Sequence, residues 1–307
     1  MAILLLLPDT KAEQLAGLLN KKLAGEDIRI WPETGRPEEI DVAVVWAHPH
    51  GALKNLPNLK LILSYGAGVD HIFNDPDLPV DVPICRFVAD SLSRQMADYV
   101  SGVILNHRLR LIDYREHQAA GNWHPWMPRR GNKVTILGLG QLGQATARQL
   151  NTLRFDVTGW SRTAKTLDYC HTCHGQDMLT EAVCEADYVV CLLPLTEETR
   201  GILNGTLFSA MKKGAYLINV GRGDHLNEND LLDALYQGHL GGACLDVFSE
   251  EPLPSVSPLW RHPRILITPH IASVTDPENL ADYVVQSFNA LKQGSSLKHL
   301  VDRQVQY

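Results

Sequence analysis

The chain has 307 residues, which is enough for two domains of ordinary size. Its formal net charge of −7 argues against nucleic acid as the main partner, because binding a phosphate backbone requires a basic face. The sequence has no run of about 20 apolar residues that could cross a bilayer and its six cysteines lack disulfide-scaffold spacing, so we expect a cytoplasmic protein without a membrane partner.

The first hundred residues alternate short apolar runs with amphipathic stretches. The apolar runs predict strands of a parallel sheet that helices cover. The expected strands are 3–7, 28–31, 42–46 and 59–64, and the expected helix is 11–23. Helical periodicity then continues over 91–118, which predicts one long connecting helix, and the Gly and Pro content of 121–128 predicts a loop.

A second α/β unit begins at Asn132. Its expected strands are 133–137, 156–160, 188–192, 215–219, 242–246 and 265–268, and its last helix is 277–292. The pattern predicts an α/β protein with two Rossmann-like or flavodoxin-like parallel-sheet domains. We expect a substrate-binding domain of residues 1–98 plus 276–307, a dinucleotide-binding domain of residues 99–275, and an active-site cleft between the two domains.

The strand predicted at 133–137 runs directly into a glycine loop at 138–143. In a dinucleotide-binding fold, Gly138 would permit the tight turn, Gly140 would let a pyrophosphate approach the backbone, and Gly143 would let the helix pack on the strand. The free N–H groups of the helix would then face the phosphates. The alternative is a glycine turn with a purely structural role.

The end of the next strand distinguishes the two dinucleotides. NAD-binding folds carry an acidic residue about 20 residues past the glycines, and it binds the ribose 2′-hydroxyl. In this chain Ser161 stands there and Arg162 follows it. A carboxylate would repel a 2′-phosphate, whereas a hydroxyl and a guanidinium would bind it. We therefore expect NADP(H) to be preferred and NAD(H) to be possible; the alternative for Arg162 is an ordinary surface residue.

Arg222, the pair Glu250 and Glu251, and His270 each follow one of the last three predicted strands. Ligands of open α/β sheets bind beyond the carboxyl ends of the strands. Reduction of a keto acid needs a cation for the carboxylate, which suits Arg222, and a proton donor, which suits His270. A glutamate would keep that histidine protonated and oriented. Each residue by itself could be structural.

These residues lie in motifs by which the chain resembles the D-isomer-specific 2-hydroxyacid dehydrogenases over essentially its whole length. The motifs are residues 64–70, 138–143, 193–196, 219–223, 246–253 and 268–270. The resemblance implies that Arg222 binds the substrate, that His270 is the acid/base, and that Glu251, directly before a proline, is the partner of the histidine. Residues 160–162, 248–254 and 257–263 further resemble the glyoxylate/hydroxypyruvate reductase branch, which prefers NADPH.

The resemblance implies further site residues and a reaction. Cofactor binding would involve Gly138, Leu139, Gly140, Gln141, Leu142, Gly143, Ser161, Arg162, Thr163, Leu193, Pro194, Val220, Gly221, Arg222 and Asp246. The substrate would contact Trp46, Tyr65, Gly66, Ala67, Gly68, Arg222 and His270. Trp46 could equally be a core aromatic residue. The implied reaction is NADPH-dependent reduction of glyoxylate to glycolate or of hydroxypyruvate to D-glycerate, in a homodimer with Trp123 and Trp126 as candidate contacts.

Two other functions stay open at this point. One is an NAD-dependent enzyme for a bulkier acid such as phosphoglycerate or phenylpyruvate, and the other is a dinucleotide sensor, since the family includes a transcriptional corepressor. We expect no metal, although residues 170–174 match a haem-attachment pattern. Cys170 and Cys173 should point to opposite faces of a strand, while zinc binding or a redox role stays open for them.

Overall fold

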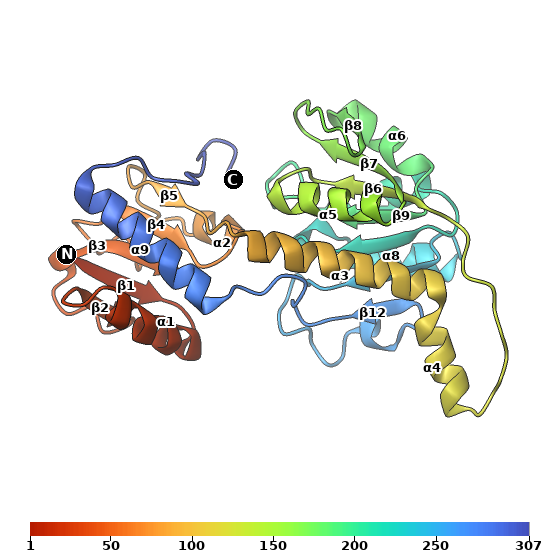
Figure 1. Ribbon diagram of the computed structural model, residues 1–307, viewed down its shortest axis with the longest axis horizontal. Helices are drawn as coiled ribbons and strands as arrows, with labels where there is room; N and C mark the ends of the chain where they lie inside the picture. The colour runs from red at the N-terminus through yellow and green to blue at the C-terminus, as the bar shows by residue number, and fades with distance from the viewer. Residues whose placement is uncertain (307) are drawn as a thin grey trace. The chain divides into compact units, whose positions relative to one another are not determined.

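The computed structural model describes residues 1–306, so the last residue of the predicted 276–307 segment lies outside the described residues. The chain forms two compact units, one of Met1–Asp90 with the segment from Thr275 onward and one of Ser91–Val274. Each unit has its own parallel sheet (Figure 1). The predicted class, two α/β parallel-sheet domains, is confirmed. The roles and limits expected for the two domains, and the cleft, stay predictions.

The first unit is built on a five-stranded sheet. Its elements are β1 (Ala2–Leu6), α1 (Asp9–Lys22), β2 (Asp27–Ile30), β3 (Ile40–Val45), β4 (Leu61–Ser64), α2 (Asp70–Phe73), β5 (Ile84–Cys85) and α9 (Pro277–Gln293). The strand order β2-β1-β3-β4-β5 is the flavodoxin-like order. β1, β3 and β4 are buried along their whole length, which explains their unbroken apolar sequences.

The second unit is built on a seven-stranded sheet. Its strands are β6 (Lys133–Leu137), β7 (Asp156–Ser161), β8 (His171–His174), β9 (Tyr188–Cys191), β10 (Tyr216–Asn219), β11 (Gly242–Leu245) and β12 (Ile265–Ile267). Its helices are α3 (Asp90–Leu109), α4 (Leu111–Ala119), α5 (Gln141–Thr152), α6 (Leu179–Cys184), α7 (Gly205–Ala210) and α8 (Glu228–Tyr236). The order β12-β11-β10-β9-β6-β7-β8 reverses direction between β6 and β9, and doubly wound sheets bind ligands beyond the carboxyl ends of the strands at such a point.

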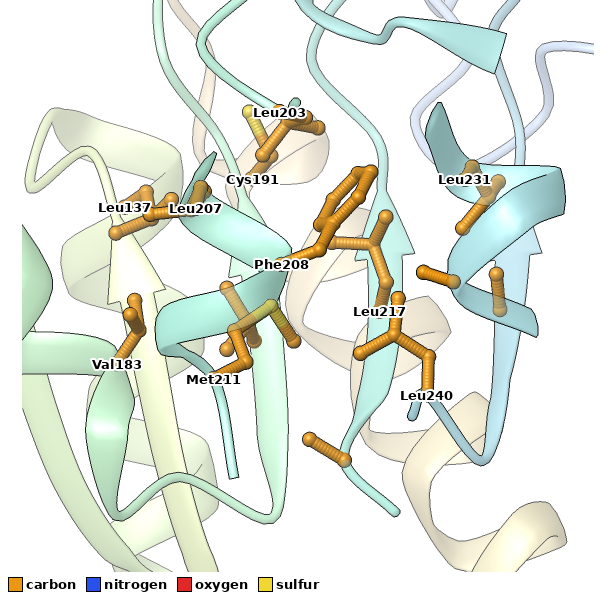
Figure 2. Packing of buried hydrophobic residues seen from close by; sticks show 14 of the residues in the cluster. Leu137, Val183, Cys191, Leu203, Leu207, Phe208, Met211, Leu217, Leu231 and Leu240 are labelled. Carbon is orange, nitrogen blue, oxygen red and sulfur yellow. The ribbon is translucent and has the colours of Figure 1, made fainter. Parts of the chain in front are cut away.

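Apolar layers cover both faces of the seven-stranded sheet. On one face α3 and α5 contribute Val100, Ile104 and Leu150. On the other face α6, α7 and α8 pack against the strands, and Figure 2 shows Phe208 lying over this layer beside Leu217. Because both faces are filled by packed side chains, the strand ends that carry the site residues are held in fixed positions.

The connecting helix differs from the prediction. Arg110 adopts a left-handed backbone conformation with a φ of 62° and separates α3 from α4. The prediction of one continuous helix over 91–118 is therefore wrong. The Arg110 guanidinium donates to the carboxylate of Asp113 at 3.1 Å and to the backbone oxygen of Met127 at 3.2 Å. These contacts fix the bend by attaching the chain to the loop that follows α4, and hydrophobic periodicity contains no signal for them.

Candidate active site

The glycine loop joins β6 to α5. Gly138 has a φ of +108°, and a Cβ there would lie 2.6 Å from the backbone oxygen of Leu192, in the segment that follows β9. A Cβ on Gly143 would lie 1.9 Å from the backbone oxygen of Gly138. A Cβ on Gly140 would meet no atom of residues 1–306 within 4 Å. Gly140 is therefore open toward the side from which a ligand would approach, next to the free N–H groups that begin α5.

The end of β7 carries the residues expected to choose between the dinucleotides. The Ser161 hydroxyl donates to the backbone oxygen of Thr163 at 2.8 Å, which closes a tight turn after the strand. The Arg162 side chain lies on the surface of this turn. A guanidinium at the strand end next to the glycine loop, in place of a carboxylate, fits a 2′-phosphate by charge.

The segment after β10 holds Arg222 through its backbone. The Asn219 side chain donates to the backbone oxygen of Arg222 at 3.0 Å, and the Arg222 N–H donates to Nδ1 of His225 at 3.0 Å. Since Nδ1 of His225 accepts, its Nε2 carries the proton and donates to the backbone oxygen of Pro194 at 3.2 Å. His225 is fully buried. It therefore ties the arginine segment to the segment that follows β9.

Glu251 and His270 form a hydrogen-bonded pair. His270 Nδ1 lies 2.8 Å from Glu251 Oε2, and the other carboxylate oxygen accepts from the backbone N–H of Phe248 at 3.0 Å. Burial raises the pKa of Glu251, but the hydrogen bonds from His270 and Phe248 and the charge of Arg222 outweigh it, so the pKa lies below its ordinary value. With Nδ1–H given to the glutamate, Nε2 is the ring atom available to a substrate.

The histidine partner is Glu251, and both it and the neighbouring Glu250 are exposed residues of the same turn. The arginine segment packs against the segment that carries Glu251, because a Cβ on Gly223 would lie 1.8 Å from the backbone carbonyl carbon of Phe248. The structure thus gathers Arg222, Glu251 and His270 at the strand ends of one unit. The arrangement offers a cation, a proton-carrying ring and a carboxylate that orients the ring, which is the set of groups that a carbonyl reduction needs.

Asp246 directly follows β11 and is 1% exposed. One carboxylate oxygen accepts from the Thr268 hydroxyl at 2.5 Å and from the Ile271 N–H at 2.9 Å, and the other accepts from the Ala272 N–H at 2.9 Å. The family resemblance assigned Asp246 to cofactor binding only. These contacts attach it to the segment that carries His270, which sequence reasoning missed because they join residues more than 20 positions apart.

The predicted substrate residues of the first unit lie at the ends of β3 and β4. A Cβ on Gly66 would lie 2.8 Å from the Trp46 ring, so the loop after β4 packs directly on the indole. The Ser64 hydroxyl donates to the backbone oxygen of Gly68 at 2.8 Å and accepts from the Gly66 N–H at 3.3 Å. Its oxygen also lies 3.2 Å from Nε2 of His71. Ser64 therefore fixes the glycine loop that was expected to hold the substrate carboxylate.

Residues His171–His174 of the cysteine-containing segment form the edge strand β8, and Cys170 directly precedes it. Cys170 packs with the apolar cluster on one face of the sheet and Cys173 with the cluster on the other, as expected from their spacing. Burial raises the pKa of both thiols, which does not favour reactive thiolates. Among residues 1–306, no group of three or more His, Cys, Asp and Glu side chains is arranged to hold a metal ion. Over the same residues, no helix has the length and apolar character to cross a membrane.

Comparisons with a family model, with protein sequences and with solved structures all find 2-hydroxyacid dehydrogenases or reductases. The family model described as D-isomer specific 2-hydroxyacid dehydrogenase, NAD binding domain, matches residues 101–272. Glyoxylate/hydroxypyruvate reductase A of Yersinia enterocolitica is 40% identical over 98% of both chains. A D-isomer specific 2-hydroxyacid dehydrogenase from Xanthobacter autotrophicus, solved with NADPH and MES, matches with a TM-score of 0.93 and 38% identity over 100% of this chain and 99% of that one.

A second solved structure similar to this chain is the NADPH-dependent glyoxylate/hydroxypyruvate reductase of Sinorhizobium meliloti, in complex with NADP and sulfate. The TM-score is 0.92 at 34% identity, and the match covers 100% of this chain and 99% of that one. The similarity to these relatives therefore extends over the full length of both units.

Proposed function

The chain belongs to the D-isomer-specific 2-hydroxyacid dehydrogenase family, and we propose that it is an NADPH-dependent reductase of small 2-keto acids. The substrates are glyoxylate, reduced to glycolate, and hydroxypyruvate, reduced to D-glycerate. The observation that carries the proposal is the hydrogen-bonded pair of His270 and Glu251, with the Arg222 segment packed against the segment of Glu251, at the strand ends of the sheet that bears the glycine loop. The names of the relatives support the choice of substrate and cofactor.

The residues of the glycine loop suit a dinucleotide. The space that a Cβ on Gly140 would occupy is empty, which leaves room for a pyrophosphate to approach the backbone. The N-terminus of α5 follows directly. When bound, NADPH supplies a hydride to the keto carbon. Arg162 supplies the charge that holds the 2′-phosphate and thereby favours NADPH over NADH, and Ser161 binds the same group once its hydroxyl turns away from the Thr163 backbone oxygen.

In this proposal each member of the trio has one task. Arg222 binds the substrate carboxylate and stabilises the charge that develops on the carbonyl oxygen. As the C=O double bond opens, His270 donates the Nε2 proton to that oxygen, which yields the hydroxyl of the product. Glu251 accepts Nδ1–H and keeps the ring aimed. The predicted contacts of Trp46 and of the loop 65–68 with the substrate are part of the same proposal.

A panel of 2-keto acids, each assayed with NADPH and with NADH by nicotinamide absorbance, tests this function. We expect turnover of glyoxylate and hydroxypyruvate, with a higher kcat/KM for NADPH. Turnover of phenylpyruvate with NADH and none of glyoxylate would instead identify an NAD-dependent enzyme for a bulkier acid. Binding of NADPH without turnover of any acid in the panel would identify a dinucleotide sensor.

We further propose a cytoplasmic homodimer. The six cysteines are free thiols, which suits a reducing compartment. Trp123 is 98% exposed and Met127 is 83% exposed, in the loop that follows α4. Trp126 instead packs within its own chain, where its backbone N–H donates to the Tyr114 hydroxyl at 2.7 Å. Sedimentation of the wild type and of Trp123→Ser tests the proposal: we expect a dimer for the first and weakened association for the second.

A further inference from the structure

A line of hydrogen bonds runs from α3 to the segment that carries His270. The Tyr99 hydroxyl lies 2.5 Å from the Thr268 hydroxyl, and the Thr268 hydroxyl lies 2.5 Å from the Asp246 carboxylate. The Cys244 thiol lies 3.3 Å from the Tyr99 oxygen at the start of the line. Tyr99 belongs to a helix, Asp246 follows β11, and Thr268 follows β12, so the line joins three elements of the second unit.

The chemistry of the groups fixes the direction of this line. A carboxylate only accepts hydrogen bonds, so the Thr268 hydroxyl must donate its single proton to Asp246. The Thr268 oxygen then accepts from Tyr99. Burial raises the pKa of Tyr99 well above its ordinary value, which keeps the phenol protonated and therefore a donor at any working pH. The hydrogen bond from Tyr99 thus orients the Thr268 hydroxyl so that it donates to the Asp246 carboxylate.

The Asp246 carboxylate in turn brackets His270. It binds Thr268 two residues before the histidine and the N–H groups of Ile271 and Ala272 just after it. The His270 N–H also donates to the backbone oxygen of Asp246 at 2.8 Å. His270 has a φ of 54°, a left-handed conformation that is uncommon for residues with a side chain and costs free energy. The hydrogen bonds to Asp246 hold the chain on both sides of this residue.

We propose that Tyr99, Thr268 and Asp246 are positioning residues that hold His270 in its left-handed conformation and so aim its ring at the substrate oxygen. The inference rests on the proposed function, in which His270 donates the proton. It adds a task for Asp246 beyond the expected cofactor binding, and it gives tasks to the Tyr99 and Thr268 hydroxyls. The Glu251 contact fixes the ring through Nδ1, while the bracket fixes the backbone from which the ring projects.

The competing explanation is that the Thr268 hydroxyl only stabilises the fold. Thr135 offers a matched control in the same sheet, because its buried hydroxyl donates to the backbone oxygen of Ala182 at 2.6 Å, in α6. Thr268→Val and Thr135→Val each remove one hydroxyl from a hydrogen bond while keeping the side-chain shape. A loss of turnover that follows the first variant and not the second cannot come from stability alone.

The experiment compares Thr268→Val, Thr268→Ser and Thr135→Val with the wild type, measuring kcat, KM for NADPH and thermal melting. We expect Thr268→Val to lower kcat for glyoxylate about 10-fold, which corresponds to ~1.4 kcal/mol, with KM for NADPH within about 2-fold. Thr268→Ser should restore most of the loss, because it keeps the hydroxyl. Thr135→Val should melt earlier and keep the wild-type kcat.

Two results would overturn the inference: full kcat in Thr268→Val, or a loss that Thr268→Ser does not restore. A crystal structure of Thr268→Val decides independently of turnover. We expect the left-handed φ of His270 or its 2.8 Å contact with Glu251 to be lost, and their retention would contradict the bracket. If the wild type reduced no keto acid, the proposed function would fail. The crystal structure of Thr268→Val would still test the positioning of His270.

Discussion

Two glycines of the same loop should respond to the same substitution in opposite ways. Gly143→Ala places a Cβ 1.9 Å from the backbone oxygen of Gly138. Because a Cβ essentially never comes within 3.0 Å of another atom, α5 or the loop must move by about 1.1 Å or more. Both segments are packed against the sheet, so we expect a loss of about 3 kcal/mol in the free energy of unfolding, the upper part of the range for overpacking.

Gly140→Ala is the matched variant. Its Cβ would meet no atom of residues 1–306 within 4 Å, and the φ of −71° at Gly140 is one that alanine adopts readily. The fold should therefore keep its stability, whereas a methyl group would stand where the pyrophosphate approaches. We expect the Kd for NADPH to rise about 10-fold or more, equivalent to ~1.4 kcal/mol or more.

The assay is thermal unfolding of both variants without nucleotide, followed by fluorescence titration with NADPH. Gly143→Ala should unfold at a clearly lower temperature, and Gly140→Ala should unfold with the wild type but bind NADPH weakly. Wild-type affinity in Gly140→Ala would refute the assignment of the loop to the pyrophosphate. Wild-type stability in Gly143→Ala would refute the packing argument.

Three further predictions concern the cofactor, the substrate loop and pH. Arg162→Ala should reduce the ratio of kcat/KM for NADPH over NADH by about 10-fold or more, since it removes the cation proposed for the 2′-phosphate; an unchanged ratio would mean that other groups choose the cofactor. Ser64→Ala frees Gly66 and Gly68 from the hydroxyl that joins them and should raise KM for glyoxylate about 10-fold with kcat/KM for NADPH retained; an equal effect on both would point to general unfolding. Burial lowers the pKa of His107 from 6.5 to about 4, so its neutral form favours the folded state fully above pH 6.5 and this stability is lost as the pH falls towards 4. Urea unfolding of His107→Gln should show a smaller loss over this range than the wild type, and equal losses would mean that burial of His107 is not the cause.

Much of the fold follows from sequence because its elements are local. Apolar runs predicted most strands, and the glycine loop marked the strand from which the sheet order reverses. The two-residue strand β5 escaped prediction because so short a run has no periodicity, and its place depends on pairing with β4. The bend at Arg110 escaped because its contacts reach Met127, which lies 17 residues farther along the chain.

Some residues of the candidate site could likewise be found from local sequence, and others could not. Arg222, Glu251 and His270 could be found because each follows a strand, and strand ends of a parallel sheet meet at one edge. The choice of Glu251 over Glu250 came from family resemblance, and the 2.8 Å contact with His270 agrees with it. Tyr99 could not be found this way, since it lies in a helix 169 residues before the threonine that it contacts. The residues that position a catalytic side chain can lie far from it in the sequence, so local patterns do not reveal them.

In the proposed function His270 supplies the proton to a keto acid, while the glycine loop of the same unit holds NADPH. His270→Ala separates these two roles, with kcat for glyoxylate and the Kd for NADPH measured on the same preparation. We predict a fall in kcat of about 1,000-fold, within the range for loss of a general acid, and a Kd for NADPH within about 2-fold of wild type. Near-normal turnover in His270→Ala would contradict the claim and remove His270 from the mechanism.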